Sequence, residues 1–193
     1  MNDQQSHPVL RPRLRYGSLA HTFSETLDTI LWVALLFTVV NLATARFVVD
    51  GISMAPNFAT GEYILVSRVS YLLGDPSRGD VVVFHYPNNT TQDYIKRVIG
   101  EPGDMVEIRD QLVYINGIAL DEPYINEPCF SNCADRTWEV GAGEFFVMGD
   151  NRNHSSDSRA FGIVKREFIV GEALLRYWPL TNFGSVMDIA YRR

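Results

Sequence analysis

The chain has 193 residues, which is enough for one ordinary domain with short appendages. Hydrophobic residues make up 46% of it and charged residues 21%, so the chain can build a packed core and is not globally disordered. The formal net charge of −6 excludes the strong basic excess that is typical of nucleic-acid-binding proteins.

The N-terminal segment is polar and basic, and an apolar segment follows it. Residues 1–14 hold two prolines and a single acidic residue, and arginines stand at positions 11, 13 and 15. Residues 30–45 are apolar apart from one asparagine and two threonines. Sixteen helical residues span only about 24 Å, against about 30 Å of hydrocarbon in a bilayer. A spanning helix would therefore extend back to Leu27 and forward to Val49, with Arg46 reaching the interface.

Three interpretations of the apolar segment are open. A buried core helix is disfavoured because the segment has no polar face. A cleaved secretory signal fits the preceding arginines and the small-x-small pattern of Ala43-Thr44-Ala45. We favour a retained anchor, in which the basic residues keep the N-terminus in the cytoplasm and the chain after Arg46 lies outside. This predicts a single-pass cell-membrane protein with a tail (1–24), an anchor (25–46) and an extracytoplasmic domain (47–193).

The chain after the apolar segment is rich in short β-type segments. Runs of Val, Ile, Phe and Tyr alternate with turn dipeptides, and Asn116-Gly117 is a strong hairpin signal. Strands are expected over 63–67, 80–86, 94–99, 105–108, 111–115, 144–148 and 163–176. The predicted fold class is mainly β, with an antiparallel, partly closed β domain preceded by one transmembrane helix.

Two cysteines, Cys129 and Cys133, lie close together in a predicted loop. A disulfide across three intervening residues is geometrically feasible and suits an oxidising compartment. Two free thiols are the plainer alternative. A zinc site completed by His85 or His154 is a third, but two ligands at this spacing are weak support for it.

Ser53, in the segment Gly51-Ile-Ser-Met-Ala-Pro56, is a candidate nucleophile in a constrained turn. A serine hydroxyl needs an adjacent base before it can attack an amide. The base could be a histidine, His85 or His154, or it could be Lys96, which stands among apolar residues and beside Arg97. Burial and a neighbouring cation both lower the pKa of a lysine toward a useful range.

A dense polar run follows the predicted strand at 144–148. It contains a hydroxyl that could orient a base, Ser155, and a candidate ion pair between Asp157 and Arg159. Such a run is most often a solvated turn. Here, however, turn-forming residues, a hydroxyl and opposite charges occur together, which favours a functional site.

Five ordered motifs resemble those of bacterial type I signal peptidases. They are Gly51-x-Ser53-Met54-x-Pro56, Gly61-Glu-Tyr-Ile-Leu-Val-Ser-Arg68, Arg78-Gly-Asp-Val-Val-Val-Phe84, Tyr94-Ile-Lys-Arg-Val-Ile-Gly100 and Gly149-Asp-Asn-Arg with Asp157-Ser-Arg159. The resemblance covers roughly residues 47–162. It implies a membrane-bound serine endopeptidase that removes signal peptides from exported proteins, cleaving after small residues in an Ala-x-Ala pattern.

The resemblance also implies roles for individual residues. Ser53 matches the nucleophile, Lys96 the general base and Ser155 the hydroxyl that orients the lysine, while Asp157 and Arg159 match a structural ion pair. Lysine instead of histidine in this motif places the chain with the bacterial type. The positions that match the shallow substrate pockets are Phe47, Val49, Met54, Phe58, Tyr94 and Ile95.

One departure from the family pattern concerns the oxyanion hole. Some members carry a hydroxyl two residues before the nucleophile, where this chain has Gly51, so the backbone N–H of Ser53 is the only donor that we assign. The expected partners are preproteins with signal peptides and the lipid bilayer, with no nucleic acid, no metal and no cofactor, and we expect a monomer. Two alternative functions are an anchored β domain that only binds secreted proteins, and a self-cleaving repressor with a Ser–Lys pair. The latter needs a DNA-binding domain where residues 1–46 offer a membrane segment.

Overall fold

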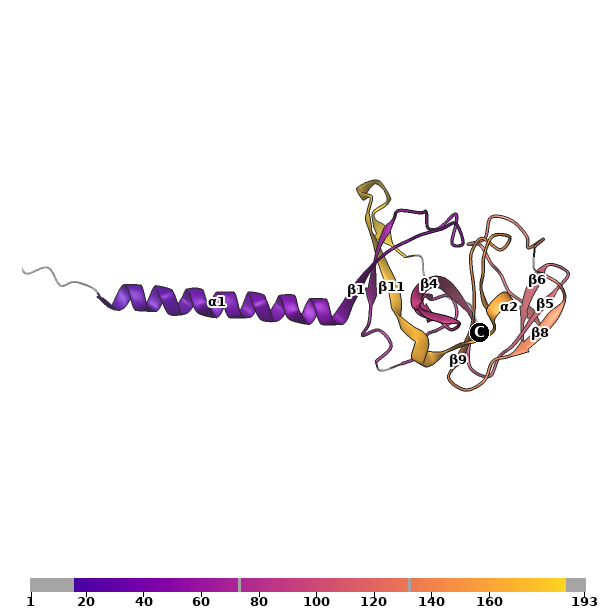
Figure 1. Ribbon diagram of the computed structural model, residues 1–193, viewed down its shortest axis with the longest axis horizontal. Coiled ribbons are helices and arrows are strands. Elements are labelled where there is room, and N and C mark those ends of the chain that lie inside the picture. Colours follow the sequence, from indigo (N-terminus) through magenta and orange to yellow (C-terminus); the bar gives the residue numbers. More distant parts are fainter. Residues whose placement is uncertain (1–15, 73, 132, 187–193) are drawn as a thin grey trace, which may run out of the picture. The chain divides into compact units, whose positions relative to one another are not determined.

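The computed structural model describes residues 16–72, 74–131 and 133–186, and the chain divides into two compact units. The first unit, Met1–Val40, carries most of a long helix. The second unit, Asn41–Arg193, carries the strands (Figure 1).

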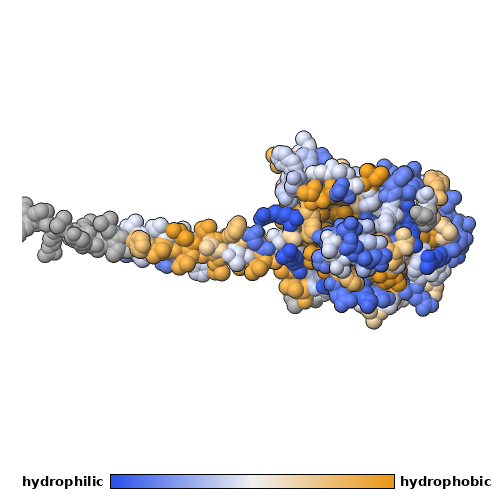
Figure 2. All heavy atoms as spheres, viewed as in Figure 1, coloured by the Kyte–Doolittle hydropathy of each residue, from blue (hydrophilic) through white to orange (hydrophobic). Residues whose placement is uncertain are grey.

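Helix α1 (Tyr16–Ala43) is the described helix that is long and apolar enough to cross a membrane. Its segment His21–Ala43 has a mean hydropathy of 1.8 and none of it is buried. Figure 2 shows many apolar side chains along the helix, with hydrophilic ones among them. At 1.5 Å per residue, 23 residues give about 34 Å, which is sufficient for a bilayer. The helix ends three residues before the predicted boundary at 46, and its predicted extension to Val49 is wrong, because residues 44–48 form a strand.

The larger sheet of the second unit has the strand order β1-β2-β11-β3-β4-β9-β10, and β12 pairs with β11. Every pairing is antiparallel. Its strands are β1 (Thr44–Val48), β2 (Tyr63–Ser67), β3 (Val81–Tyr86), β4 (Asn89–Gly100), β9 (Glu144–Met148), β10 (Val164–Lys165), β11 (Ile169–Trp178) and β12 (Gly184–Ser185). The sheet is open, with β1 at one edge and β10 at the other.

The smaller sheet is also antiparallel and has the order β7-β6-β5-β8. Its strands are β5 (Met105–Arg109), β6 (Leu112–Ile115), β7 (Ile118–Ala119) and β8 (Arg136–Glu139). Three short helical turns complete the described elements: α2 (Ser158–Phe161), η1 (Arg166–Phe168) and η2 (Leu180–Asn182). The predicted mainly β, antiparallel class is confirmed, as is the hairpin at Asn116-Gly117, which joins β6 to β7.

The larger sheet buries an apolar cluster next to β1 that fixes the segment between β1 and β2. Val49, Met54 and Phe58 come from that segment, and they pack with Ile64 of β2 and Val83 of β3. Met54 is fully buried, so the segment is tied to the sheet on both sides of Ser53. This packing positions the candidate nucleophile.

Candidate active site

Ser53 lies in an irregular segment whose backbone is fixed by short-range hydrogen bonds. Gly51 has a φ of +97°, a conformation that side chains disfavour. The hydroxyl of Thr60 donates to the carbonyl of Gly51 at 2.9 Å and accepts from its N–H at 3.2 Å. Ala55 N–H donates to the carbonyl of Ile52 at 3.1 Å, which closes the turn around Ser53. The predicted constrained turn is therefore present.

Lys96 reaches Ser53 from strand β4. Its Nζ donates to Ser53 Oγ at 2.8 Å and to the carbonyl of Ile95 at 2.8 Å, and only 4% of the residue is exposed. Burial lowers the pKa of Lys96 to about 8, although the negative charges of Asp157 and Asp150 act to raise it. Much of this lysine is therefore neutral in mildly alkaline solution and can accept a proton.

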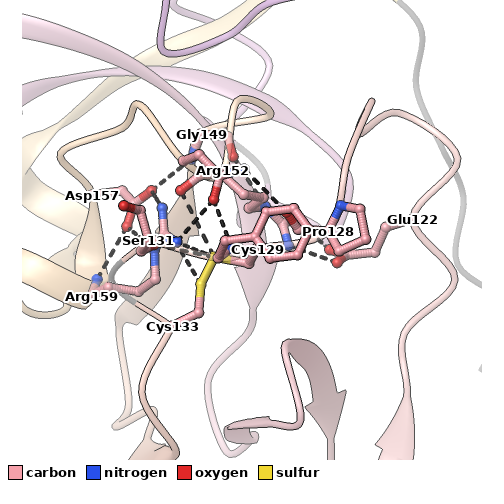
Figure 3. Close-up of a disulfide and its surroundings, with 11 residues drawn as sticks. Glu122, Pro128, Cys129, Ser131, Cys133, Gly149, Arg152, Asp157 and Arg159 are labelled. Carbon is pink, nitrogen blue, oxygen red and sulfur yellow. Dashed lines mark hydrogen bonds and ion pairs between the residues drawn. A yellow bond between two sulfur atoms is a disulfide. The ribbon is translucent and has the colours of Figure 1, made fainter.

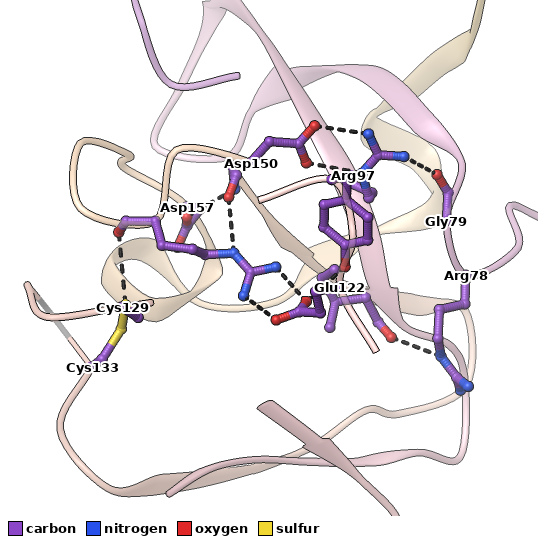
Figure 4. A network of polar contacts seen from close by, with 12 residues as sticks. Arg78, Gly79, Arg97, Glu122, Cys129, Cys133, Asp150 and Asp157 are labelled. Carbon is purple, nitrogen blue, oxygen red and sulfur yellow. Dashed lines mark hydrogen bonds and ion pairs between the residues drawn. A yellow bond between two sulfur atoms is a disulfide. The ribbon is translucent and has the colours of Figure 1, made fainter. Parts of the chain in front are cut away.

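Arg97 does not contribute to that lowered pKa, so our expectation about the neighbouring cation is wrong. Successive side chains of a strand point to opposite faces, and Arg97 is buried away from Lys96. Its guanidinium binds Asp150 through two hydrogen bonds of 2.8 and 2.7 Å and donates to the carbonyl of Gly79 at 2.8 Å. The charge of Arg97 is thereby compensated by Asp150 (Figure 4).

The loop after β9 holds the segment around the candidate nucleophile Ser53 from the other side. This segment, residues 51–58, is called the nucleophile segment below. Asn151 donates from its backbone N–H to the carbonyl of Ser53 at 3.0 Å, and from its amide side chain to the carbonyl of Ile52 at 3.1 Å. Asp150 accepts a bond of 2.7 Å from Asn57 Nδ2. Sequence reasoning identified this polar run but missed these contacts, which join residues about 100 positions apart and leave no local pattern.

Ser155 lies in the same loop, close to the backbone of Ser53. A methyl group on Gly149 would be 2.3 Å from Ser155 Oγ and 2.4 Å from the carbonyl oxygen of Ser53, so these atoms crowd one point. Ser155 Oγ is buried and makes no hydrogen bond of ordinary geometry to the described residues, although it helps to lower the pKa of Asp157. The hydrogen bonds described for Lys96 Nζ go to Ser53 and Ile95, and the orienting role of Ser155 stays a prediction.

Asp157 and Arg159 form a buried, bidentate ion pair, with N–O distances of 2.8 and 2.7 Å. Asp157 also accepts the N–H of Gly149 at 3.0 Å and caps helix α2. Burial acts to raise its pKa, but the bonds from Arg159 and Gly149 outweigh burial, and the pKa of Asp157 is lowered. The carboxylate therefore stays charged close to Lys96.

The two cysteines form a disulfide that contacts the same arginine (Figure 3). Arg159 Nη1 lies 2.9 Å from the sulfur of Cys129 and 3.1 Å from that of Cys133. Their Cα atoms are 5.9 Å apart, a normal distance for a disulfide. No group of three or more His, Cys, Asp or Glu residues that could hold a metal ion occurs in the described part of the chain.

A cleft of about 580 Å³ opens at Ser53 and Lys96. Four of the six predicted pocket residues line it, namely Phe47, Val49, Tyr94 and Ile95. The other two, Met54 and Phe58, do not line the cleft but are buried in the apolar cluster beside it. The residues that sequence reasoning did not assign to the cleft include Asp50, Gln92, Asp93 and Ser156.

The histidines do not take the place of the lysine. His85 Nδ1 pairs with Asp93 Oδ1 at 2.6 Å on an exposed part of the sheet. His154 lines the cleft, but the hydrogen bond described for Ser53 Oγ comes from Lys96. The amine is the base candidate with direct access to the serine.

Two strand edges border the cleft. β1 is one edge strand of its sheet, and among the described strands residues 93–96 of β4 pair with β3 alone. Such edges accept an extended peptide through backbone hydrogen bonds. A serine hydroxyl that is bonded to a buried amine, beside edges of this kind, defines the class of the site: a serine hydrolase site suited to a polypeptide substrate.

Comparison with known proteins identifies the family. The model of the family described as "Signal peptidase, peptidase S26" matches residues 23–178. Signal peptidase IB of Staphylococcus aureus strain COL is 36% identical over 179 residues, covering 82% of this chain and 93% of its own. Signal peptidase I of Bacillus caldolyticus is 39% identical over 152 residues, covering 72% and 82%. A solved signal peptidase I of Enterococcus faecalis V583 is 39% identical, covering 51% of this chain and 96% of its own, with a TM-score of 0.45.

This chain belongs to the peptidase S26 family of signal peptidases. Membership makes the protein a serine peptidase of the signal-peptide-removing type, as its sequence motifs predicted.

Proposed function

We propose that the protein is a membrane-bound endopeptidase that removes signal peptides by means of a Ser53–Lys96 dyad, cleaving after small residues. The observation that carries this proposal is the 2.8 Å bond from Lys96 Nζ to Ser53 Oγ at a site where burial lowers the pKa of the amine to about 8. A buried amine of this kind can do the work that histidine does in other serine peptidases.

The chemistry follows from the geometry. Neutral Lys96 takes the proton of Ser53 as Oγ attacks the carbonyl carbon of the scissile bond. The protonated amine then gives that proton to the leaving nitrogen, and water, deprotonated by the same lysine, hydrolyses the acyl-enzyme. The backbone N–H of Ser53 is our candidate oxyanion donor, because Gly51 carries no hydroxyl. Ser155 is our candidate to orient Lys96 after small movements of the loop.

Substrate preference is assigned to the apolar wall of the cleft. Phe47, Val49, Tyr94 and Ile95 present apolar groups close to Ser53. An extended peptide alternates its side chains, so two side chains, two positions apart, face this wall together. Shallow apolar pockets at both positions would accept alanine and exclude larger residues, which gives the Ala-x-Ala pattern.

We further propose that α1 is the membrane anchor, with the basic N-terminal segment in the cytoplasm and the β domain outside. The length and apolar surface of His21–Ala43 support the anchor. The arginines at positions 11, 13 and 15 support the orientation, although they lie outside the described residues.

The test is cleavage of a preprotein that bears a signal peptide by the full-length enzyme in detergent micelles. Ser53→Ala and Lys96→Ala should lose activity while keeping the fold, and Lys96→Arg should also be inactive because arginine stays protonated. The chain has one other lysine, the exposed Lys165, so Lys165→Ala is a matched control that should retain activity. Turnover near wild type in Ser53→Ala or Lys96→Ala would refute the dyad.

A further inference from the structure

The peptide groups on either side of Gly149 are held by two buried ion pairs (Figure 3). The N–H of Gly149 donates to Asp157 at 3.0 Å, and Asp157 is paired with Arg159. The carbonyl of Gly149 accepts from Arg152 Nε at 3.1 Å, and Arg152 is paired with Glu122. One pair belongs to the family motif, but the second was not apparent from the sequence.

The Glu122–Arg152 pair is bidentate and almost completely buried. The two side chains are 7% and 1% exposed. Arg152 Nη1 donates to Glu122 Oε2 at 2.6 Å, Nη2 donates to Oε1, and the hydroxyl of Tyr124 donates to the same Oε1 at 2.6 Å. Because desolvation offsets much of the attraction in such a pair, stability alone is a weak reason for its presence.

Glu122 lies in the loop that connects β7 and β8 of the smaller sheet. This loop also contacts the nucleophile segment. The backbone carbonyl of Tyr124 accepts from Asn57 Nδ2 at 2.8 Å, and Asn57 lies four residues after Ser53. The ring of Tyr124 lies 4.3 Å from the guanidinium carbon of Arg97 and 5.8 Å from that of Arg152. Figure 4 shows Glu122 in the same polar network as the Arg97–Asp150 ion pair, although Glu122 bonds to neither of these two residues in the contacts described above.

The position of Gly149 explains why this network matters for the reaction. A Cβ there would meet Ser155 Oγ at 2.3 Å and the carbonyl oxygen of Ser53 at 2.4 Å. Any displacement of Gly149 therefore moves atoms that touch the nucleophile and its neighbour. Arg152 fixes the carbonyl end of this residue, and Glu122 fixes Arg152.

We propose that Glu122 is a positioning residue of the peptidase: through Arg152 it holds the Gly149 carbonyl, and with it the loop that sets Ser53 and Ser155 against Lys96. This inference rests on the proposed function. Glu122 does not line the cleft, so it acts on the rate of the chemical step and not on substrate binding.

The test compares variants of the full-length enzyme in detergent micelles, with a fluorogenic peptide that has Ala at the first and third positions before the scissile bond. Glu122→Gln removes the charge at nearly constant shape, and Tyr124→Phe removes only the hydroxyl that supports Glu122. Glu127→Gln is the matched control, since Glu127 is an exposed residue of the same loop. All assays run roughly 15 °C below the lowest melting midpoint, so that every variant is folded.

We expect Glu122→Gln to lower kcat about tenfold or more with little change in KM, because small displacements of reacting groups have large effects on rate. Tyr124→Phe should lower kcat in the same direction by about threefold, and Glu127→Gln should behave as wild type. A purely structural pair would lower the melting midpoint and leave kcat unchanged. Unchanged kcat in Glu122→Gln and Tyr124→Phe would therefore overturn the inference. If Glu122→Gln does not fold, the kcat of Tyr124→Phe is the deciding measurement.

Hydrogen exchange gives a readout that does not depend on turnover. The amide of Asn151, which donates to the carbonyl of Ser53, should exchange faster in Glu122→Gln and Tyr124→Phe but not in Glu127→Gln. If the wild type fails to cleave any signal-peptide substrate, the proposed function is wrong, and exchange alone then decides whether Glu122 holds the loop. Unchanged exchange in both variants would refute that role.

Discussion

The Cα of Gly149 lies so close to the carbonyl of Ser53 that no side chain fits between them. The first side-chain atom would be 2.4 Å from that oxygen, well inside the distance of closest approach. The loop after β9 and the nucleophile segment are therefore packed backbone to backbone, and this contact needs glycine for reasons of space.

Gly149→Ala should inactivate the enzyme without preventing folding. The added methyl group must push apart Ser53 and Ser155, and a shift of about 1 Å at reacting groups can cost on the order of 100-fold in rate. Gly184→Ala is the control, because a Cβ on Gly184 meets no atom within 4 Å. Normal kcat in Gly149→Ala, measured with the preprotein assay, would show that the loop can move without harm.

The pH–rate profile should report the buried amine. The pKa of Lys96 is about 8, so the active neutral form should be about one tenth of the enzyme at pH 7 and most of it at pH 9. We expect kcat/KM to rise through an alkaline limb centred near pH 8. A rise only above about pH 10 would indicate an ordinary solvated lysine and contradict the role of burial.

Lys96→Met should stabilise the fold while abolishing activity. The native pKa of about 8 lies below the ordinary value of 10.5, so the charged form is disfavoured by burial, at a cost of about 3 kcal/mol below pH 8. Loss of the bond to Ser53 offsets about 1 kcal/mol of the gain. Between pH 8 and 10.5 the unfolded wild type binds more protons than the folded wild type, so the free energy of unfolding of the wild type rises with pH. The advantage in stability of Lys96→Met therefore shrinks over this range. Thermal melts of both proteins at pH 7 and pH 10 test this; equal midpoints at pH 7 would contradict it.

Asp157→Asn should destabilise the protein by about 3–5 kcal/mol, because it leaves the buried guanidinium of Arg159 without its carboxylate. Asp75→Asn is the matched control: Asp75 also pairs with an arginine, but its side chain is 70% exposed, and the expected loss is about 0–1 kcal/mol. Denaturant unfolding of the two variants measures the difference. Equal losses would mean that burial does not decide the strength of these pairs.

Replacing both Cys129 and Cys133 by serine should lower stability by about 2 kcal/mol, the loop-closure contribution for five residues. A thiol reductant should lower the melting midpoint of the wild type to a similar degree and have no effect on the double variant. Identical midpoints with and without reductant would contradict the disulfide.

The sequence predicted most of the larger sheet, because its strands carry their own signals. Val81–Tyr86 and Glu144–Met148 are apolar runs between turns, and Ser53 and Lys96 lie in motifs that are recognisable by spacing. Strand β1 was missed because Thr44–Val48 follow the apolar helix without a turn signal. Strand β8 was missed because Arg136–Glu139 has only four residues with a charge at each end, although Thr137 and Trp138 favour strands.

Long-range polar pairing could not be predicted. Glu122 and Arg152 are 30 residues apart, and nothing local distinguishes them from surface charges. The partner of Arg97 could not be predicted for the same reason. Its position next to Lys96 in the sequence suggested repulsion between the two charges. Successive side chains of a strand point to opposite faces, however, and Arg97 binds Asp150 in the loop after β9.

Strand β1 contains part of a small-x-small sequence, Ala43-Thr44-Ala45, of the kind that the proposed activity cuts. In the folded domain Thr44 and Ala45 pair with Ser67 and Val66 of β2, and Ala45 is only 8% exposed. A protease needs this segment extended and free, whereas here one backbone edge is already occupied by β2.

Resistance to cleavage by other copies of the same enzyme is therefore a property of local folding. Another molecule can cut after Ala45 only while β1 is detached from β2. The rate of cleavage between copies of the enzyme is therefore proportional to the fraction of molecules in which β1 is detached. Substitutions that weaken β2, such as at the fully buried Val66, would turn an intact enzyme into a substrate without touching Ser53.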